Sequence, residues 1–156
     1  MEIKQADIDD AEAVYAVVQA GFGEYRDALP VPVSALDETM EDVRREISGG
    51  HVLLATEDGE AVGTVRYELR PDHLYVGRLA VSPAYRRRGV GAALMTYIEK
   101  LAPTLGHTRI RLATRQSMPS NLLFYEQLGY KVIQRLAHER GPDIAVWFEK
   151  EVGGQS

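Results

Sequence analysis

The 156-residue chain contains no cysteine. Disulfides, thiolate metal sites and a cysteine nucleophile are therefore excluded. No apolar run approaches the length of a membrane span, and the N-terminus lacks the charged-then-apolar order of a signal peptide. These absences favour a cytoplasmic protein that does not insert into a membrane.

Positive charge is outnumbered, since 18 Lys and Arg stand against 23 Asp and Glu and give a formal net charge of -5. A nucleic-acid-binding protein normally has a net positive charge or a broad basic stripe, so we expect no nucleic-acid partner. The arginines instead gather locally, at Arg78, at 86–88 and at Arg109, Arg111 and Arg115. A small basic cluster on an acidic chain indicates a compact anionic ligand.

The sequence also lacks a pattern of metal-binding residues. The histidines have no ligand spacing and no cysteine partners, so we expect no metal site. The four of them are His51, His73, His107 and His138. The length fits one domain, which we place at 1–152, followed by a disordered tail at 153–156.

The hydrophobic pattern changes its period along the chain and predicts the order of the elements. Helical spacing is found at 11–20, 37–47, 90–101 and 120–128. Strand-like runs are found at 2–4, 52–56, 61–69, 75–81, 109–114, 131–136 and 145–149. A turn at 57–60 joins two of these strands as a hairpin. The order predicts a single α/β domain, with a mixed sheet and helices on both of its faces.

The most informative stretch is 86–92, with the sequence Arg-Arg-Arg-Gly-Val-Gly-Ala. It follows a strand-like run and opens a periodic helix. Backbone amides freed by Gly89 and Gly91 at a helix start, with cationic side chains beside them, form a site for phosphate groups. A side chain at these glycines would keep the backbone from approaching the phosphates. The stretch therefore predicts a polyphosphate ligand.

Two sequence signatures connect this loop with a known family. The first is a loop with the pattern Arg/Gln-x-x-Gly-x-Gly/Ala that follows a strand ending in Ala-Val. This chain has Arg86, Gly89 and Gly91 at the defined positions of the pattern. In the second, Asn121 opens a short helix that continues as Phe-Tyr-x-x-x-Gly-Tyr at 124–130. With both signatures in order and one helix and one strand between them, the chain resembles the GNAT acyltransferase superfamily.

The resemblance implies a single-domain GNAT-like fold, in which a mostly antiparallel central sheet splays open at the cofactor cleft and is flanked by helices. It also implies an acyl-CoA-dependent N-acyltransferase, and an N-acetyltransferase in particular. Such an enzyme moves an acetyl group from acetyl-CoA to an amine by direct attack in a ternary complex. The expected acceptor is a small-molecule or peptide amine, and a homodimer is common in the family.

The resemblance also implies roles for individual residues. The cofactor-binding residues are Leu79, Ala80, Val81, Arg86, Arg87, Arg88, Gly89, Val90, Gly91 and Asn121. The strand residues offer backbone groups to the pantetheine arm and an amide to the oxyanion. The loop amides hold the pyrophosphate, and Asn121 contacts the cofactor arm. Tyr125 is the catalytic residue and protonates the departing thiolate.

Each role has a plainer alternative. The side chains of Arg87 or Arg88 could face solvent, with only their backbone functional. Asn121 could cap the short helix. Tyr125 could be a core residue, since aromatic side chains often fill such positions.

The general base, which removes a proton from the incoming amine, stays open. Some family members have a glutamate near the start of the strand before the loop, where this chain has Tyr75. Glu68 on the neighbouring strand, Glu24 in the first long loop and a water chain are the other candidates. The first loop and the helix after it are acidic, which favours a cationic amine as acceptor. Their acidic residues are Glu24, Asp27, Asp37, Glu38 and Asp42.

Two other functions are compatible with parts of the sequence. The lack of an obvious base suits a non-catalytic acyl-CoA sensor or interaction module that retains the fold. A dinucleotide-binding oxidoreductase would use Gly89 and Gly91, but it needs a third glycine at Leu94 and an acid after the next strand. The chain has Thr-Arg-Gln at 114–116, so the oxidoreductase is disfavoured.

Overall fold

The computed structural model describes residues 1–153, so the expected tail at 153–156 lies outside the described residues except for Gly153. The strands are β1 (Glu2–Gln5), β2 (Val52–Glu57), β3 (Glu60–Leu69), β4 (Leu74–Val81), β5 (Arg109–Arg115), β6 (Lys131–Ala137) and β7 (Ile144–Glu151). The α-helices are α1 (Ala11–Phe22), α2 (Met40–Ser48), α3 (Val90–Thr104) and α4 (Pro119–Gln127). Short 3-10 helices lie at Ile8–Asp10, Gly23–Tyr25, Ser34–Asp37 and Pro83–Tyr85.

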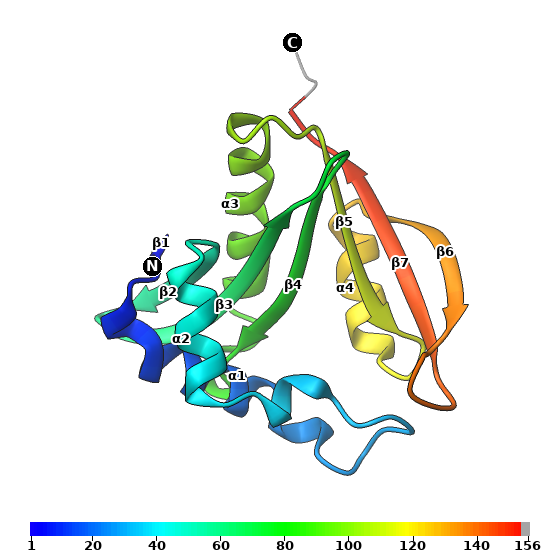
Figure 1. Ribbon diagram of the computed structural model, residues 1–156, viewed down its shortest axis with the longest axis horizontal. Coiled ribbons are helices and arrows are strands. Elements are labelled where there is room, and N and C mark those ends of the chain that lie inside the picture. The colour runs from blue at the N-terminus through cyan, green and yellow to red at the C-terminus, as the bar shows by residue number, and fades with distance from the viewer. Residues whose placement is uncertain (154–156) are drawn as a thin grey trace.

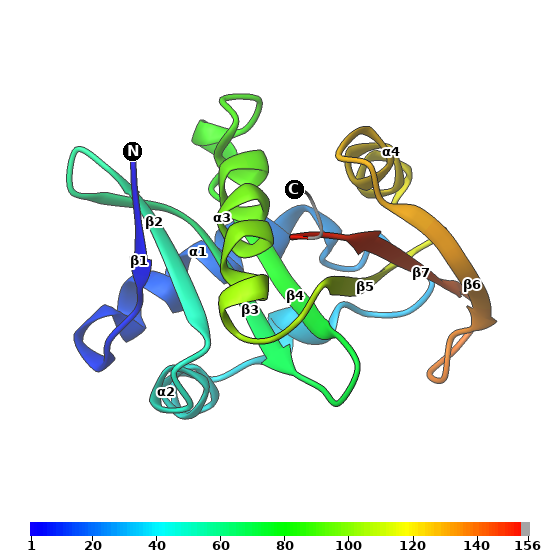
Figure 2. The ribbon, with the colours of Figure 1, turned by 90° about the horizontal axis from the view of Figure 1, so that it is seen from above.

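Within residues 1–153 the strands form one mixed sheet in the order β1-β2-β3-β4-β5-β7-β6. Every neighbouring pair is antiparallel except β4 and β5, which run parallel (Figure 1). Helices α1 and α2 cover one face of the sheet, and α3 and α4 cover the other (Figure 2). The predicted α/β class and the placement of helices on both faces are thereby confirmed. No helix in the described part of the chain is long and apolar enough to cross a membrane.

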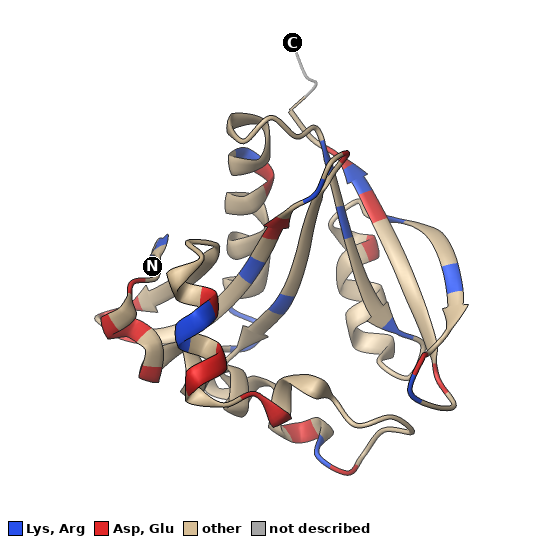
Figure 3. Ribbon diagram, viewed as in Figure 1, with Lys and Arg blue, Asp and Glu red and all other residues tan. Residues whose placement is uncertain are grey.

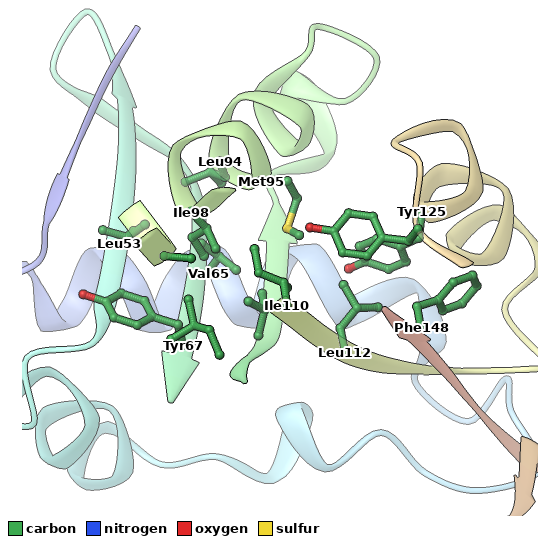
Figure 4. Packing of buried hydrophobic residues seen from close by; sticks show 14 of the residues in the cluster. Leu53, Val65, Tyr67, Leu94, Met95, Ile98, Ile110, Leu112, Tyr125 and Phe148 are labelled. Atoms are coloured by element: carbon green, nitrogen blue, oxygen red, sulfur yellow. The ribbon is translucent and has the colours of Figure 1, made fainter. Parts of the chain in front are cut away.

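Two hydrophobic clusters hold the helices to the sheet. The larger lies under α3 and α4 (Figure 4), and its fully buried members include Leu53, Val65, Leu94, Met95, Ile98, Ile110 and Phe148. The smaller joins α1 and α2 to β2, and its fully buried members are Val14, Val18, Ala35 and Val43. Burial of each large apolar side chain contributes about 1.5–3 kcal/mol. These clusters fix the two helical layers on either side of the sheet.

The hairpin between β2 and β3 turns at Asp58 and Gly59, whose φ angles are 51° and 79°. Positive φ at both central residues is what a type I′ turn requires, and an Asp-Gly pair meets that requirement. Glu57 pairs with Glu60 across the turn. The turn predicted at 57–60 is therefore confirmed.

Helix α2 begins three residues later than predicted, at Met40 instead of Asp37. The Thr39 hydroxyl accepts a hydrogen bond from the Asp42 amide at 3.1 Å, and the Asp42 carboxylate accepts one from the Thr39 amide at 2.9 Å. This capping box fixes the first turn of the helix. Glu38 consequently lies before the helix in extended backbone, and it is only 9% exposed.

Strand β4 bulges where it pairs with β3. Arg78 and Leu79 of β4 together face the single residue Val65 of β3. The φ angle of Arg78 is 54°, in the left-handed region that a non-glycine residue seldom adopts. An extra residue in one strand bends that strand and increases its twist.

The sheet opens between β4 and β5. Their only pairs are Leu74 with Ile110 and Tyr75 with Arg111. Beyond these pairs the two strands diverge, and the gap between them widens toward the C-terminal end of each (Figure 1). The predicted splay of the sheet is present.

Candidate active site

A cavity of about 740 Å³ lies at the opening between β4 and β5. Leu79 on β4 and Thr114 on β5 line it from the two strands, and Asn121 and Tyr125 line it from α4. Of the other two β4 residues expected at the cofactor, Ala80 is buried and Val81 packs against the larger hydrophobic cluster. The cavity thus brings Asn121 and Tyr125 of the second signature beside Leu79, whereas Arg86, Gly89 and Gly91 of the first signature do not line it.

The loop before α3 depends on glycine at its last position. Gly89 is the N-cap of α3 and has a φ angle of 81°. A Cβ atom at this position would meet nothing within 4 Å. The left-handed backbone is therefore by itself a reason for glycine here, and the predicted need for space beside a phosphate stays a prediction. Arg87, with a φ of 63°, is a second left-handed residue in the same loop.

The first turn of α3 presents backbone amides without helical acceptors. The first hydrogen bond of the helix runs from the Ala93 amide to the Gly89 carbonyl at 2.9 Å. The amides of Val90, Gly91 and Ala92 precede it and cannot be satisfied within the helix. Together with the positive end of the helix dipole, they form an anion-binding group.

Gly91 is explained by contact with α4. A Cβ atom at Gly91 would lie 3.2 Å from Cζ of Phe124 and 3.7 Å from a methyl carbon of Val81. The sequence prediction attributed this glycine to the approach of phosphate. The structure adds a second reason, the close packing of α3 against the helix that carries Tyr125, and the approach of phosphate stays a prediction.

Arg86 fastens the loop to the end of α1. Its guanidinium donates a hydrogen bond to the Gly21 carbonyl at 2.7 Å and pairs with the Glu24 carboxylate at 3.0 Å. Arg87 and Arg88 are exposed, and the Arg88 guanidinium lies 5.1 Å from the centre of the Tyr85 ring. The plainer alternative for these two side chains, exposure to solvent, agrees with the structure.

Tyr125 is both a core residue and a cavity residue. It is 9% exposed, and the rings of Phe124, Tyr130 and Phe148 surround it with centroids at 5.0, 5.9 and 5.9 Å. Burial, with a smaller contribution from Tyr75, raises the pKa of the Tyr125 hydroxyl well above its usual value near 10. The hydroxyl is therefore protonated at neutral pH and can donate a hydrogen bond.

Asn121 does not cap α4. The helix begins one residue earlier than predicted, at Pro119, and its N-cap is Met118. The Asn121 amide nitrogen lies 3.4 Å from the Thr114 hydroxyl and 3.4 Å from the Met118 sulfur. The predicted capping alternative is wrong, and the side chain lies at the wall of the cavity instead.

The candidate bases differ in their positions. Glu68 lines the cavity and pairs with Arg70 at 3.1 Å. Tyr75 also lines it, and burial raises the pKa of its hydroxyl, which makes it a poor proton acceptor. Glu24 is engaged by Arg86 at the end of α1. Glu68 is the best placed of the three.

Sequence reasoning missed the buried ion pair of Glu38 and Arg66. The two side chains are 6% and 10% exposed, and the Arg66 guanidinium donates to both Glu38 carboxylate oxygens, at 2.6 and 2.5 Å. Both residues line the cavity. Two signals of this pair were available in the sequence. One is an arginine within the apolar run of β3, and the other is the capping box that ends at Asp42.

A family model described as the Acetyltransferase (GNAT) family matches residues 16–130. Among solved structures, an aminoglycoside 6'-N-acetyltransferase complexed with coenzyme A has a TM-score of 0.78 at 18% identity, covering 100% of this chain and 99% of its own. The PaiA N-acetyltransferase of Thermoplasma acidophilum, in complex with coenzyme A, has a TM-score of 0.77 at 21% identity, covering 96% and 98%.

A third similar structure is the ribosomal-protein-S18-alanine N-acetyltransferase of Escherichia coli. Its TM-score is 0.77 at 18% identity, and the match covers 99% of this chain and 96% of that one. At these identities the three structures establish a common fold. Two of them are named for different acceptors, an aminoglycoside and an alanine of a ribosomal protein, so the fold alone does not select an acceptor.

Proposed function

Since the chain belongs to the acetyltransferase (GNAT) family, we propose that it transfers an acetyl group from acetyl-CoA to the amine of a small molecule or peptide. The observation that carries this proposal is the cavity of about 740 Å³ between the parted strands, lined by Leu79 of β4 and by Asn121 and Tyr125 of α4. The coenzyme A complexes of two proteins with the same fold support the choice of donor.

In this proposal the chain holds acetyl-CoA as a substrate in two places. The free amides at the start of α3, from the loop 86–89 to Gly91, bind the pyrophosphate. Leu79, Ala80 and Val81 offer backbone groups of β4 to the pantetheine arm at the side where β5 has moved away. Asn121, on the opposite wall, contacts the same arm.

The proposed reaction is a direct attack of the neutral amine on the thioester carbonyl. A new C–N bond forms, a tetrahedral oxyanion develops, and the C–S bond then breaks to release the thiolate of coenzyme A. A backbone amide within 79–81 donates a hydrogen bond to the oxyanion. Tyr125 donates its proton to the thiolate. The cavity contributes by holding the two reactants together.

Deprotonation of the amine is assigned in the proposal to Glu68, acting directly or through water. Glu68 is exposed at the cavity, where bulk water can carry the proton away. Tyr75 is not used, because its pKa is raised by burial. Glu24 is not used, because it does not line the cavity.

Binding and turnover test the proposal separately. Calorimetric titration is expected to show saturable binding of acetyl-CoA and none of NADPH. Release of the free thiol, followed with a chromogenic disulfide, is expected only when an amine is added. Replacement of Tyr125 by Phe is expected to lower kcat by about 10²-fold or more with little change in acetyl-CoA affinity. An unchanged rate across the pH range would remove Tyr125 from the mechanism.

A non-catalytic acyl-CoA sensor is the second candidate, and one observation favours it. Two of the carboxylates that line the cavity, Glu38 and Glu68, are already paired with arginines. A sensor would bind acetyl-CoA with the same affinity but release no thiol with any amine. One efficiently acetylated acceptor rules it out.

A further inference from the structure

Part of the acidic charge in the first long loop and at the start of α2 is paired within the protein. Glu24 pairs with Arg86 at 3.0 Å, and Asp42 both accepts the Thr39 amide and pairs with Arg45 at 3.2 Å. Asp27 and Asp37 form no ion pair within residues 1–153, so the segment stays acidic. Glu38 is the one acidic residue of this segment that lines the cavity in the described part of the chain, so the charges that favoured a cationic acceptor lie mostly outside the cavity.

Glu38 is shared by two arginines of the cavity wall. Arg66 engages both of its carboxylate oxygens, and the Nε atom of Arg78 lies 4.0 Å from one of them. One carboxylate faces two guanidinium groups, so this cluster keeps one uncompensated positive charge. All three residues line the cavity.

Arg115 adds a positive charge from the other strand. It lines the cavity at the end of β5 and donates hydrogen bonds to the main-chain carbonyls of Val31 and, at 3.0 Å, of Pro32. Within residues 1–153 it forms no ion pair with a carboxylate. Blue bands cross β3, β4 and β5 on both sides of the gap between the strands (Figure 3).

The other two carboxylates that line the cavity, Glu46 and Glu68, offset the positive charges of the arginines only weakly. The Glu68 side chain is 62% exposed and pairs with Arg70. Glu46 is exposed on α2. Charges in contact with bulk water are screened, whereas the partly buried arginines are screened much less.

The backbone of Arg78 is a second, independent sign of a role for its side chain. The φ angle of 54° is one that glycine adopts without strain. Residues in such conformations cluster at ligand clamps, where the surrounding structure holds them in place. Arg78 also directly precedes the residues 79–81 that we propose to bind the thioester.

We propose that the acceptor amine also carries a carboxylate, and that Arg78 binds this carboxylate while Arg115 attracts it from the opposite wall. The inference rests on the proposed N-acetyltransferase function and names its substrate class. Because Arg78 adjoins the thioester-binding segment, the reacting amine and the carboxylate are only a few bonds apart. Amino acids and their short derivatives with a free carboxyl group fit this description, and long polyamines do not.

Matched pairs of acceptors test the inference. Initial rates of thiol release are measured with free amino acids, with the corresponding amino-acid amides and with spermidine. The amides have the same amine but no negative charge. The free acids are expected to be acetylated with a kcat/KM about tenfold or more above that of their amides, since a hydrogen-bonded charge contributes about 1.5–3 kcal/mol.

Variants at Arg78 separate its charge from its backbone strain. Replacement of Arg78 by Gln is expected to raise KM for the acids about 10- to 100-fold and to leave the kinetics of the amides within about twofold. Arg78→Lys should recover part of the affinity, because it keeps the charge but not the planar fork. Arg78→Gly should raise KM for the acids as much as Arg78→Gln does, although glycine relieves the strain of the backbone at this position. Arg45→Gln, on the exposed side of α2, is the matched control and should change neither acceptor class.

The outcomes separate this inference from the proposed function. Faster acetylation of amides or spermidine than of free acids would overturn the inference and leave the acetyltransferase in place. Failure of acetyl-CoA to bind would overturn the proposed function itself. If acetyl-CoA binds but no acceptor turns over, thermal shifts with coenzyme A present decide. Stabilisation by an acid in wild type and Arg45→Gln but not in Arg78→Gln supports the inference, and no stabilisation in wild type overturns it.

Discussion

Phe124 on α4 lies directly against Gly91 in the first turn of α3, where a Cβ atom would be 3.2 Å from Cζ of the ring. The loop signature and the Asn-Phe-Tyr signature thus meet in space. The helix start that presents free amides and the helix that carries Tyr125 and Asn121 are consequently positioned by one another. A change at either residue is expected to move both parts of the site.

Replacement of Gly91 by Ala is expected to destabilise the protein by about 1–3 kcal/mol through overpacking against Phe124. The free energy of unfolding from denaturant titration measures this, and acetyl-CoA affinity should fall with it. Gly23→Ala is the control, since a Cβ atom there meets nothing within 4 Å. Combining Gly91→Ala with Phe124→Leu should recover part of the lost affinity. No recovery would contradict the packing explanation.

Gly89→Ala is expected to cost about 1–2 kcal/mol for a different reason, the left-handed backbone with its φ of 81°. The same denaturant titration measures the loss. Because nothing lies near the added Cβ, Phe124→Leu should give no recovery in this background. Equal recovery in both glycine variants would show that the two glycines are needed for one and the same reason.

Glu38→Ala is expected to destabilise the fold by about 3–5 kcal/mol, because Arg66 would keep a charge on a side chain that is only 10% exposed. Replacement of both residues by Met should restore most of the stability, since the buried charge of Arg66 is removed together with that of Glu38, and Arg78, the other arginine near Glu38, is 31% exposed. Chemical denaturation of the two variants checks this. A single variant as stable as wild type would indicate that water reaches the pair.

Alkaline pH is expected to destabilise the protein through Tyr125. Burial raises the pKa of this hydroxyl in the folded state above the value near 10 that it has when unfolded. The stabilising contribution is therefore complete below about pH 10 and is lost as pH rises toward the folded-state pKa, at about 1.4 kcal/mol per pH unit. Tyr125→Phe lacks a titrating group, so its free energy of unfolding should fall less steeply between about pH 9 and 11.

Burial also raises the pKa of Tyr130, which lowers the stability at alkaline pH in wild type and in Tyr125→Phe alike. The difference between their free energies of unfolding therefore reports on Tyr125. Parallel pH profiles of wild type and Tyr125→Phe would mean that hydroxide reaches the Tyr125 hydroxyl in the folded protein.

The pH dependence of the rate distinguishes the candidate bases. Glu68→Gln is expected to lower kcat/KM and to shift the rise in rate toward higher pH, where more of the free amine is neutral. Glu24→Gln is expected to keep the pH profile and to loosen the loop, because it removes the ion pair with Arg86. Rates at saturating acetyl-CoA, measured with the same amine for both variants, check this. The reverse pattern would assign the base to Glu24.

Local signals predicted most of the fold. The Asp-Gly turn, Gly129 after α4 with its φ of 92°, and the loop before α3 each require a particular backbone, which a few residues specify alone. Helix α2 was predicted too long because its acidic start continues the polar pattern, and the Thr39–Asp42 capping box decides where it begins.

The site was only partly predictable, because its electrostatics depend on contacts between distant segments. Arg86 binds the Gly21 carbonyl, which is 65 residues away in the sequence, and Glu38 binds Arg66, which is 28 residues away. No sequence spacing encodes these pairs. The bulge that leaves Arg78 with a positive φ arises from the pairing of β3 with β4, which local sequence does not reveal.

Arg78 and Arg115 also contact one short stretch of chain from opposite strands. Arg78 lies 3.3 Å from the Ser34 hydroxyl, and Arg115 binds the carbonyls of Val31 and Pro32. Residues 31–34 thereby bridge β4 and β5 beside the opening between these strands. Moving the two strands further apart to admit a bulkier thioester would break these bonds, so this bridge limits the width of the opening.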